Sequence, residues 1–158
     1  RALAATLDAI GFGCSYIPAG GETSAMTRPF AGNVLTSDAA RYARNAELAT
    51  AFPDLAIGDP TVGWVAAAFR QIDAFAEFDY PRRIATPTLI LAAGDDRVVS
   101  TPATERFAAR LKAGRALIIP AARHEILMET DAIRAQFWAA FDAFVPGEME
   151  TAARAATA

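Results

Sequence analysis

Two short apolar runs, TPTLILAAG at 86–94 and RALIIP at 115–120, place the tightest limit on what this chain can fold into. Each run has the length of a strand and shows no alternation of apolar and polar residues, which is typical of a strand buried on both faces. Between them, TPATERFAARLKAG predicts a helix that starts from a Thr101 cap followed by Pro102 and stops at Gly114. The segment therefore predicts the order strand, helix, strand.

Two fully apolar strands joined by a helix predict a right-handed parallel unit of an α/β fold. Parallel sheets need several neighbouring strands and helices on both faces, and a sheet of two strands is marginal by itself. We therefore expect the sheet to be incomplete in this chain, with further strands in sequence that precedes Arg1.

Helical patterns dominate the chain before the first strand and return after the second. We expect helices over about 1–10, 38–51, 59–80 and 131–145. A long glycine-rich loop follows the first helix, and the third helix is expected to start from an Asp59 cap before Pro60. The chain then divides into a helical region at 1–83, an α/β part at 84–147 and a disordered tail at 148–158.

Charge and composition exclude several classes of partner. The 158 residues include 15 basic and 18 acidic side chains, and a net charge of -3 offers no basic footprint for a nucleic acid.

Cys14 is the only cysteine, so no internal disulfide can form, and we expect it to be a small buried residue. With one cysteine and one histidine and no phosphate-binding glycine motif, we expect no metal and no cofactor. Without a run of about 18 apolar residues or a signal-peptide pattern, we expect a soluble, cytoplasmic protein.

Side chains that can act as an acid and a base follow the ends of both predicted strands. Asp95 and Asp96 follow the first strand, and His124, the only histidine, lies four residues beyond the second. Because the carboxyl ends of neighbouring parallel strands meet at one edge of a sheet, we expect a carboxylate and the imidazole to lie within contact distance. A carboxylate that fixes one ring nitrogen leaves the other to take a proton from a nucleophile. The alternative is a loop histidine and two helix-capping aspartates.

The strings DDRVV and RHEILME, in this spacing, resemble the last two strand regions of the α/β-hydrolase fold, in the branch that contains lysophospholipases and monoacylglycerol lipases. The strings GFGCSYIPAGG, NVLTSDAARYARN and PDLAIGDPTVGWVAAA resemble the lid of bacterial lysophospholipase-like members. The resemblance covers the chain up to Val145. It implies the C-terminal part of an α/β-hydrolase fold, with 1–83 as the lid, Asp96 as the catalytic acid and His124 as the base.

The family's nucleophile is a serine in a G-x-S-x-G elbow that precedes the acid, and no such pentapeptide is present. Ser15 in GCSYI keeps half of this pattern, but a helical pattern precedes it and Ile17 replaces the second glycine. Ser24 in a glycine-rich loop, and Ser37 and Ser100 as helix caps, are interpreted as structural. We expect the nucleophile and the oxyanion hole to belong to a preceding stretch of a longer polypeptide, so that this chain alone is inactive.

Aromatic side chains of the helical region are candidates for contact with an acyl chain. Tyr16, Phe30 and Trp64 could line such a pocket, or they could pack a small core of the lid itself. Phe69, on an apolar helix stripe, is interpreted as core. Glu125, beside the base, is interpreted as a helix-start residue without a chemical role.

The resemblance implies a serine hydrolase that cleaves carboxylic esters of fatty acyl groups, such as lysophospholipids or monoacylglycerols. Its partners would be a small lipid or ester substrate and, peripherally, a membrane surface. Two alternatives stay open. One is a truncated, non-catalytic remnant or binding module of the same fold. The other is a different chemistry, because peptidases, haloperoxidases and other esterases share this acid and base arrangement. The sequence leaves the oligomeric state open.

Overall fold

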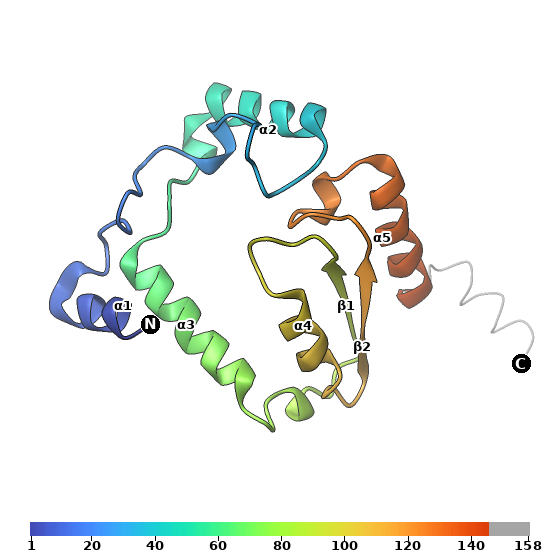
Figure 1. Cartoon of the computed structure of the whole chain (residues 1–158). Helices are drawn as coiled ribbons and strands as arrows, with labels where there is room; N and C mark the ends of the chain where they lie inside the picture. The colour runs from blue at the N-terminus through green and yellow to red at the C-terminus, as the bar shows by residue number, and fades with distance from the viewer. Residues whose placement is uncertain (146–158) are drawn as a thin grey trace, which may run out of the picture. The chain divides into compact units, whose positions relative to one another are not determined.

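A computed structural model describes residues 1–145 of the chain (Figure 1). These residues form two compact units, which we call the helical unit and the α/β unit. The helical unit comprises 1–33, 39–85 and 110–112, and the described part of the α/β unit comprises 34–38, 86–109 and 113–145. The division into a lid at 1–83 and a core at 84–147 stays a prediction, and the tail predicted at 148–158 lies outside the described residues.

The α/β unit is built on two parallel strands, β1 (Thr88–Ala93) and β2 (Gly114–Ile119). The pairing register places Thr88 opposite Gly114 and Ala93 opposite Ile119, so the two strands end side by side. The prediction of two parallel strands is therefore confirmed, and the loops that follow them start from the same edge of the sheet.

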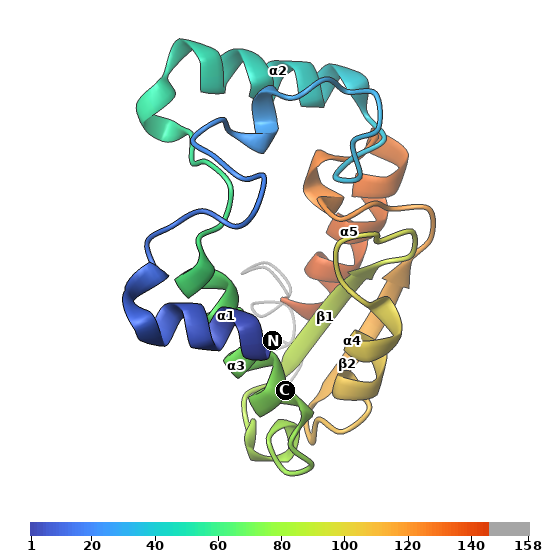
Figure 2. The same cartoon turned by 60° about the vertical axis from the view of Figure 1, so that its left-hand side comes forward.

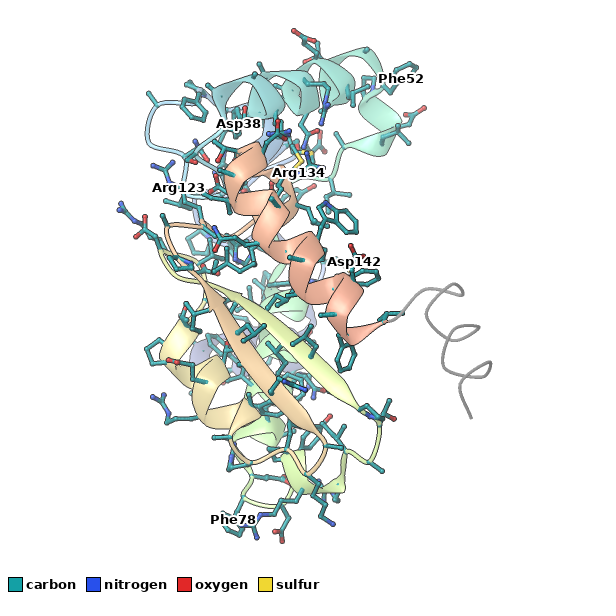
Figure 3. All side chains as sticks on the ribbon, turned by 90° about the vertical axis from the view of Figure 1, so that its right-hand side faces the viewer. Asp38, Phe52, Phe78, Arg123, Arg134 and Asp142 are labelled. Atoms are coloured by element: carbon teal, nitrogen blue, oxygen red, sulfur yellow. The ribbon has the colours of Figure 1, made fainter. Side chains whose placement is uncertain are left out.

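Helices cover the two strands from both sides. α4 (Thr101–Ala108) connects β1 to β2, and α5 (Asp131–Phe144) follows β2 after the 3-10 turn η5 (Ile126–Met128). Figures 1 and 3 show α4 on one side of the strands and α5 on the other. This order of strand, helix, strand and helix, with the strands parallel, is the α/β arrangement that the sequence predicts.

The core of the α/β unit lies at the carboxyl ends of the strands. Ala93, Ile119 and Ala122 are buried together, and four partly buried side chains pack against them, namely Leu91, Ile126, Ile133 and Phe137. The prediction that both strands are buried on both faces is wrong for the described residues. Leu117 and Ile118 on β2 are 44% and 38% exposed, because only one helix lies on each side of the two-stranded sheet.

One of the two caps predicted for α4 is confirmed, and the predicted end is wrong. Ser100 caps the helix and Thr101 does not, because the Ser100 hydroxyl oxygen accepts a hydrogen bond from the N–H of Ala103 at 3.3 Å. The Thr101 hydroxyl instead donates to the carbonyl of Ala93 at 2.6 Å. The helix ends at Ala108, well before Gly114, since Gly114 is already paired as the first residue of β2.

The helical unit contains three α-helices in its described residues, with short turns between them. The elements are α1 (Ala2–Leu7), the π-type turn η1 (Asp8–Phe12), η2 (Ala25–Thr27), α2 (Ala39–Ala51), η3 (Pro53–Leu55), α3 (Val62–Ala76) and η4 (Pro81–Arg83). The three predicted helices of this region are confirmed. Figures 1 and 2 show α1 lying against α3, and these two helices are in direct contact.

The start of α3 corrects the predicted cap. Thr61 is the N-cap, and its side-chain oxygen accepts from the N–H of Trp64 at 3.2 Å. The carboxylate of Asp59 instead accepts from the Arg28 guanidinium at 2.6 and 2.8 Å and from the N–H of Gly21 at 3.2 Å. Asp59 therefore closes the preceding glycine-rich loop and does not cap the helix.

Two further expectations for the helical unit are wrong. Cys14 is exposed and not buried, because it lies in the turn that follows η1. The third predicted helix stops at Ala76, before the expected end near Tyr80, and the chain continues through a turn into Pro81–Arg83.

Among residues 1–145, no helix has the length and apolarity that crossing a membrane would require.

Candidate active site

The loops that follow β1 and β2 are joined by backbone hydrogen bonds beyond the last pair of the sheet. The N–H of Gly94 donates to the carbonyl of Ile119, and the N–H of Asp95 donates to the carbonyl of Ala122, both at 2.9 Å. The pairing of the strands thus extends into the loops. It places the residue that follows Asp95 close to the loop that carries His124.

Asp96 and His124 are in contact across these loops. The Nδ1 atom of His124 lies 3.0 Å from Oδ2 and 3.2 Å from Oδ1 of Asp96. Oδ1 of Asp96 also accepts from the N–H groups of Val98 at 2.8 Å and Val99 at 3.0 Å. The carboxylate therefore holds the turn that follows it and the imidazole at the same time.

Burial and hydrogen bonding act in opposite directions on Asp96, whose side chain is only 5% exposed. Burial by itself would raise the pKa of this carboxyl. The hydrogen bonds from the Val99 N–H, the His124 ring and the Val98 N–H, with the attraction of His124, outweigh burial and hold the pKa of Asp96 below its ordinary value of 3.8. Near neutral pH the carboxylate is ionised and can only accept hydrogen bonds.

The tautomer of His124 follows from the charge of Asp96. Because the ionised carboxylate can only accept, Nδ1 of His124 carries the proton of the neutral ring, and the lone pair is on Nε2. Within the described residues, Nε2 makes no hydrogen bond, and the His124 side chain is 33% exposed. This is the arrangement of a general base whose second nitrogen is open to a reacting group.

A cavity of about 210 Å³ adjoins the pair. Asp96 and His124 line it together with apolar side chains that include Leu91, Val99 and Ile126. Pockets for drug-sized ligands have volumes of about 300–1,000 Å³. The cavity is therefore smaller than a typical pocket for a ligand of that size.

The neighbouring aspartate has different surroundings. The carboxylate of Asp95 lies 3.5 Å from the Arg97 guanidinium, and its side chain is 48% exposed. The structure thus brings together Asp96 and His124, and it gives Asp95 a solvent-exposed partner of its own.

The four serines have the surroundings of structural residues. Ser100 caps α4, as predicted, and the Ser37 hydroxyl donates to the carboxylate of Glu129. Ser24 is buried, and its side-chain oxygen accepts from the N–H of Met26 at 3.3 Å. Ser15 lies in the helical unit, where its carbonyl accepts from the N–H of Val62 at 2.8 Å. None of these contacts activates a hydroxyl as a nucleophile.

The three aromatic residues expected to contact substrate all lie in the helical unit. Tyr16, Phe30 and Trp64 are 39%, 37% and 64% exposed, so each has apolar surface available to a ligand. Phe30 also packs edge to face with Tyr42, at a centroid distance of 5.4 Å. Their role in substrate binding stays a prediction.

Sequence reasoning missed Glu129, which is fully buried in the α/β unit. Its carboxylate accepts from the backbone N–H of Arg123, the residue before His124, at 2.9 Å. The signal in the sequence is weak, because an acidic residue after a short apolar stretch is most often exposed.

Within residues 1–145, no group of three or more His, Cys, Asp or Glu side chains is arranged to hold a metal ion.

Comparison with solved structures identifies the class of fold. The chain superposes on a soluble variant of monoglyceride lipase from Saccharomyces cerevisiae, solved with a substrate analog, with a TM-score of 0.64. The superposition covers 90% of this chain and 47% of the lipase chain, at 15% sequence identity. The fold of the chain is therefore part of an α/β-hydrolase fold.

Comparison of sequences identifies the family. The model of the serine aminopeptidase S33 family of hydrolases matches residues 7–131, and the chain belongs to this family. It is also 40% identical over 116 residues to lysophospholipase L2 of Escherichia coli strain K12, and equally to that of Escherichia coli O6:H1. Each alignment covers 67% of this chain and 33% of the relative, so the chain spans about a third of the length of these curated relatives. The predicted resemblance to the lysophospholipase and monoacylglycerol lipase branch is confirmed.

Proposed function

We propose that this chain supplies the acid and the base of a serine hydrolase that cleaves carboxylic esters of fatty acyl groups. The observation that carries this proposal is the contact of 3.0 Å between the ionised carboxylate of Asp96 and Nδ1 of His124, with Nε2 left open. Two relatives named lysophospholipase support a lipid ester as the substrate class. In this proposal the substrate is a lysophospholipid or a monoacylglycerol.

In the proposed mechanism, His124 moves the protons and Asp96 orients it. Nε2 of His124 takes the proton from a serine hydroxyl as that oxygen attacks the ester carbonyl, and later gives the proton to the leaving alcohol. Asp96 holds the ring and stabilises the positive charge of the imidazolium. A water molecule then releases the fatty acid by the same route. The serine and the oxyanion hole come, in this proposal, from sequence outside these 158 residues.

The proposed acyl contacts and location follow the same reading of the sequence. Tyr16, Phe30 and Trp64 are proposed to contact the acyl chain, because they are exposed aromatic side chains of the helical unit. We also propose a cytoplasmic protein that touches a membrane peripherally, since its substrates would be membrane lipids. No cofactor or metal takes part in the proposed reaction.

A second candidate is a non-catalytic binding module of the same fold. The absence of a G-x-S-x-G pentapeptide from these 158 residues favours it. The DNA upstream of Arg1 discriminates between the two. An in-frame G-x-S-x-G after a strand-like run supports the hydrolase, and a start codon at the boundary supports the binding module.

The experiment that tests the proposal compares neighbouring aspartates in the full-length protein. Turnover of a short-chain nitrophenyl ester is measured for the wild type and for His124→Ala, Asp96→Asn and Asp95→Asn. We expect His124→Ala to abolish turnover and Asp96→Asn to lower kcat by about 10⁴-fold, because an amide stabilises the wrong tautomer of the ring.

Asp95→Asn is the matched control, because it removes the same charge one residue away without touching His124. We expect its kcat to stay within about threefold of the wild type, since Asp95 pairs only with an exposed arginine. Undiminished turnover after His124→Ala, or equal losses in both aspartate variants, would contradict the assignment.

A further inference from the structure

Among the described residues, Glu129 has the largest fully buried side chain, and 0% of the residue is exposed. Taking a carboxylate out of water costs several kcal/mol unless hydrogen bonds compensate for the lost hydration. A buried glutamate that the proposed reaction does not use therefore needs an explanation in its contacts.

The contacts of Glu129 join two distant parts of the chain. Oε1 accepts from the backbone N–H of Arg123 at 2.9 Å and from that of Ser37 at 3.1 Å, and Oε2 accepts from the Ser37 hydroxyl. Ser37 belongs to the segment Val34–Asp38, which we call the 34–38 segment and which is part of the α/β unit. Figure 3 shows Asp38 and Arg123 at the same end of the unit, near the start of α5.

The same segment holds the backbone on the other side of His124. The N–H of Glu125 donates to the carbonyl of Leu35 at 2.8 Å. The Arg123 guanidinium donates to the carbonyl of Thr36 at 3.0 Å, and the Thr36 hydroxyl donates to the carbonyl of Met128 at 2.7 Å. The backbone N–H groups immediately before and after His124 are therefore both fixed, one by Glu129 and one by the 34–38 segment.

These contacts decide where the imidazole can be. Asp96 orients the His124 ring through Nδ1, but a contact of 3.0 Å survives only if the backbone that carries the ring is also held. A displacement of about 1 Å in a reacting group can lower a rate by about 10²-fold. Removing the carboxylate would leave the donors from Arg123 and Ser37 without this acceptor, so the test of Glu129 needs a readout at His124 besides stability.

We propose that Glu129 is a positioning residue for His124, which acts by tying the backbone of Arg123 to the 34–38 segment. This inference rests on the proposed function, because it assigns His124 the role of the base. In this proposal reach, and not charge, is the property that matters, since the carboxylate accepts from two backbone N–H groups at fixed places.

Two substitutions separate reach from charge. Glu129→Gln keeps the length and an acceptor for both N–H groups, and the Ser37 hydroxyl can accept from its amide nitrogen. Glu129→Asp keeps the charge but shortens the side chain by one methylene group, so that the carboxylate no longer spans the gap. Glu105→Asp, the same change on an exposed residue of α4, is the matched control.

The first readout is the His124 ring itself, in protein made with ¹⁵N-labelled histidine. In the 158-residue chain the signal is unique because His124 is the only histidine, and in a longer polypeptide it is the signal lost in His124→Gln. We expect one protonated Nδ1 in the wild type, in Glu129→Gln and in Glu105→Asp. We expect Glu129→Asp to show a mixture of tautomers and a broadened Nδ1 proton, while its amide spectrum stays dispersed.

The second readout is the kinetics of the full-length protein, with active sites counted by covalent labelling of the nucleophile. We expect Glu129→Asp to lower kcat per active site by about 10²-fold with little change in KM. We expect Glu129→Gln to retain kcat within about threefold. If Glu129→Asp does not fold, Ser37→Ala replaces it, because it removes the hydroxyl donor and leaves both N–H donors, and we expect a smaller broadening of the same His124 signal.

The outcomes separate this inference from the proposed function. A wild-type protein without esterase activity overturns the proposed function, and the ring spectra still decide whether Glu129 positions His124. Unchanged His124 signals and unchanged kcat per active site in Glu129→Asp overturn the inference and leave the proposed function intact, even if this variant melts earlier. An impaired Glu129→Gln beside an intact Glu129→Asp would show that charge matters instead, which also overturns it.

Discussion

Asp95 and Asp96 are neighbours in the chain, yet their carboxylates have very different surroundings. Asp96 is nearly buried and accepts hydrogen bonds from two backbone N–H groups and an imidazole, whereas Asp95 is half exposed beside an arginine. The difference arises because the backbone of Asp95 is still paired with Ala122, which directs the two consecutive side chains apart. A single backbone hydrogen bond thus helps to decide which aspartate meets the histidine.

The lowered pKa of Asp96 predicts how stability depends on pH. A carboxyl whose folded pKa lies below its unfolded value of 3.8 stabilises the fold at higher pH, and this stability is lost as the pH falls through the folded pKa. We therefore expect Asp96→Asn to be less stable than the wild type near pH 6, and the difference to shrink below about pH 4.

Chemical unfolding of both proteins at several pH values between about 6 and 3 measures this difference. Asp95→Asn serves as the control, because its carboxylate has an exposed partner, and a pair of that kind contributes at most about 1 kcal/mol. A gap between wild type and Asp96→Asn that stays constant over this range would show that the hydrogen bonds to Asp96 do not favour its ionised form.

At this scale the sequence was informative about Asp96 and His124 but not about Glu129. The first pair could be placed because each residue follows a strand, and parallel strands end at one edge. Glu129 could not be placed, because its partner Ser37 is 92 residues away in the sequence and no local pattern links the two. The exposure of Cys14 was missed for a similar reason, since composition does not tell whether a turn is covered.

The sequence pattern predicts which helices and strands form, but it does not predict where each of them ends. The apolar runs and helical stripes identified both strands and all of the principal helices, because these patterns extend over several turns or over the whole strand. The pattern predicts a helix stop at Gly114, but this residue pairs with Thr88 as the start of β2, and α4 already ends at Ala108. Strand pairing competes with helix termination for the same glycine, and only tertiary structure decides between them.

The end of β1 depends on a glycine that has no room for a side chain. A Cβ atom on Gly94 would lie 3.0 Å from the carbonyl oxygen of Ile119 and 3.2 Å from Cα of Pro120, which are both backbone atoms. We expect Gly94→Ala to lower the free energy of unfolding by about 1–3 kcal/mol, because the two strand ends must move apart.

Gly21→Ala is the comparison for this substitution, because a Cβ atom there has no neighbour within 4 Å. We expect its effect on the free energy of unfolding, measured by urea denaturation, to stay within about 0.5 kcal/mol. Equal stability of Gly94→Ala and the wild type would show that the loops beyond the strands yield without strain.

At the scale of the whole molecule, large apolar side chains of the α/β unit are exposed. Leu117 and Ile118 of β2 and Trp138 and Phe141 of α5 are each between 38% and 44% exposed, and among residues 1–145 no third strand pairs with either β1 or β2. Unpaired strand edges and apolar faces of this kind favour association between copies. The incomplete sheet could be predicted from the sequence, because two buried-type strands are too few for a parallel sheet.

We therefore expect the isolated 158-residue chain to self-associate as its concentration rises. Light scattering after size-exclusion chromatography measures the effect, and Leu117→Lys is expected to reduce it because a charge on a strand opposes pairing between edges. Leu3→Lys, at a residue that is 71% exposed in the helical unit, is the control and should have little effect. A monomer at all concentrations, with one sharp thermal transition, would contradict this expectation.

The hydrogen bonds of the 34–38 segment also determine how this chain can be recombined with a relative. A hybrid with one crossover near residue 84 would take Ser37 from one parent and Glu129 from the other, and so would separate two side chains that bind each other. A hybrid that transfers 34–38 together with the chain from residue 86 onward keeps the pair from a single parent. The block of sequence that contains His124 is therefore discontinuous, and exchanges of the helical unit between relatives should keep 34–38 together with the chain from residue 86 onward.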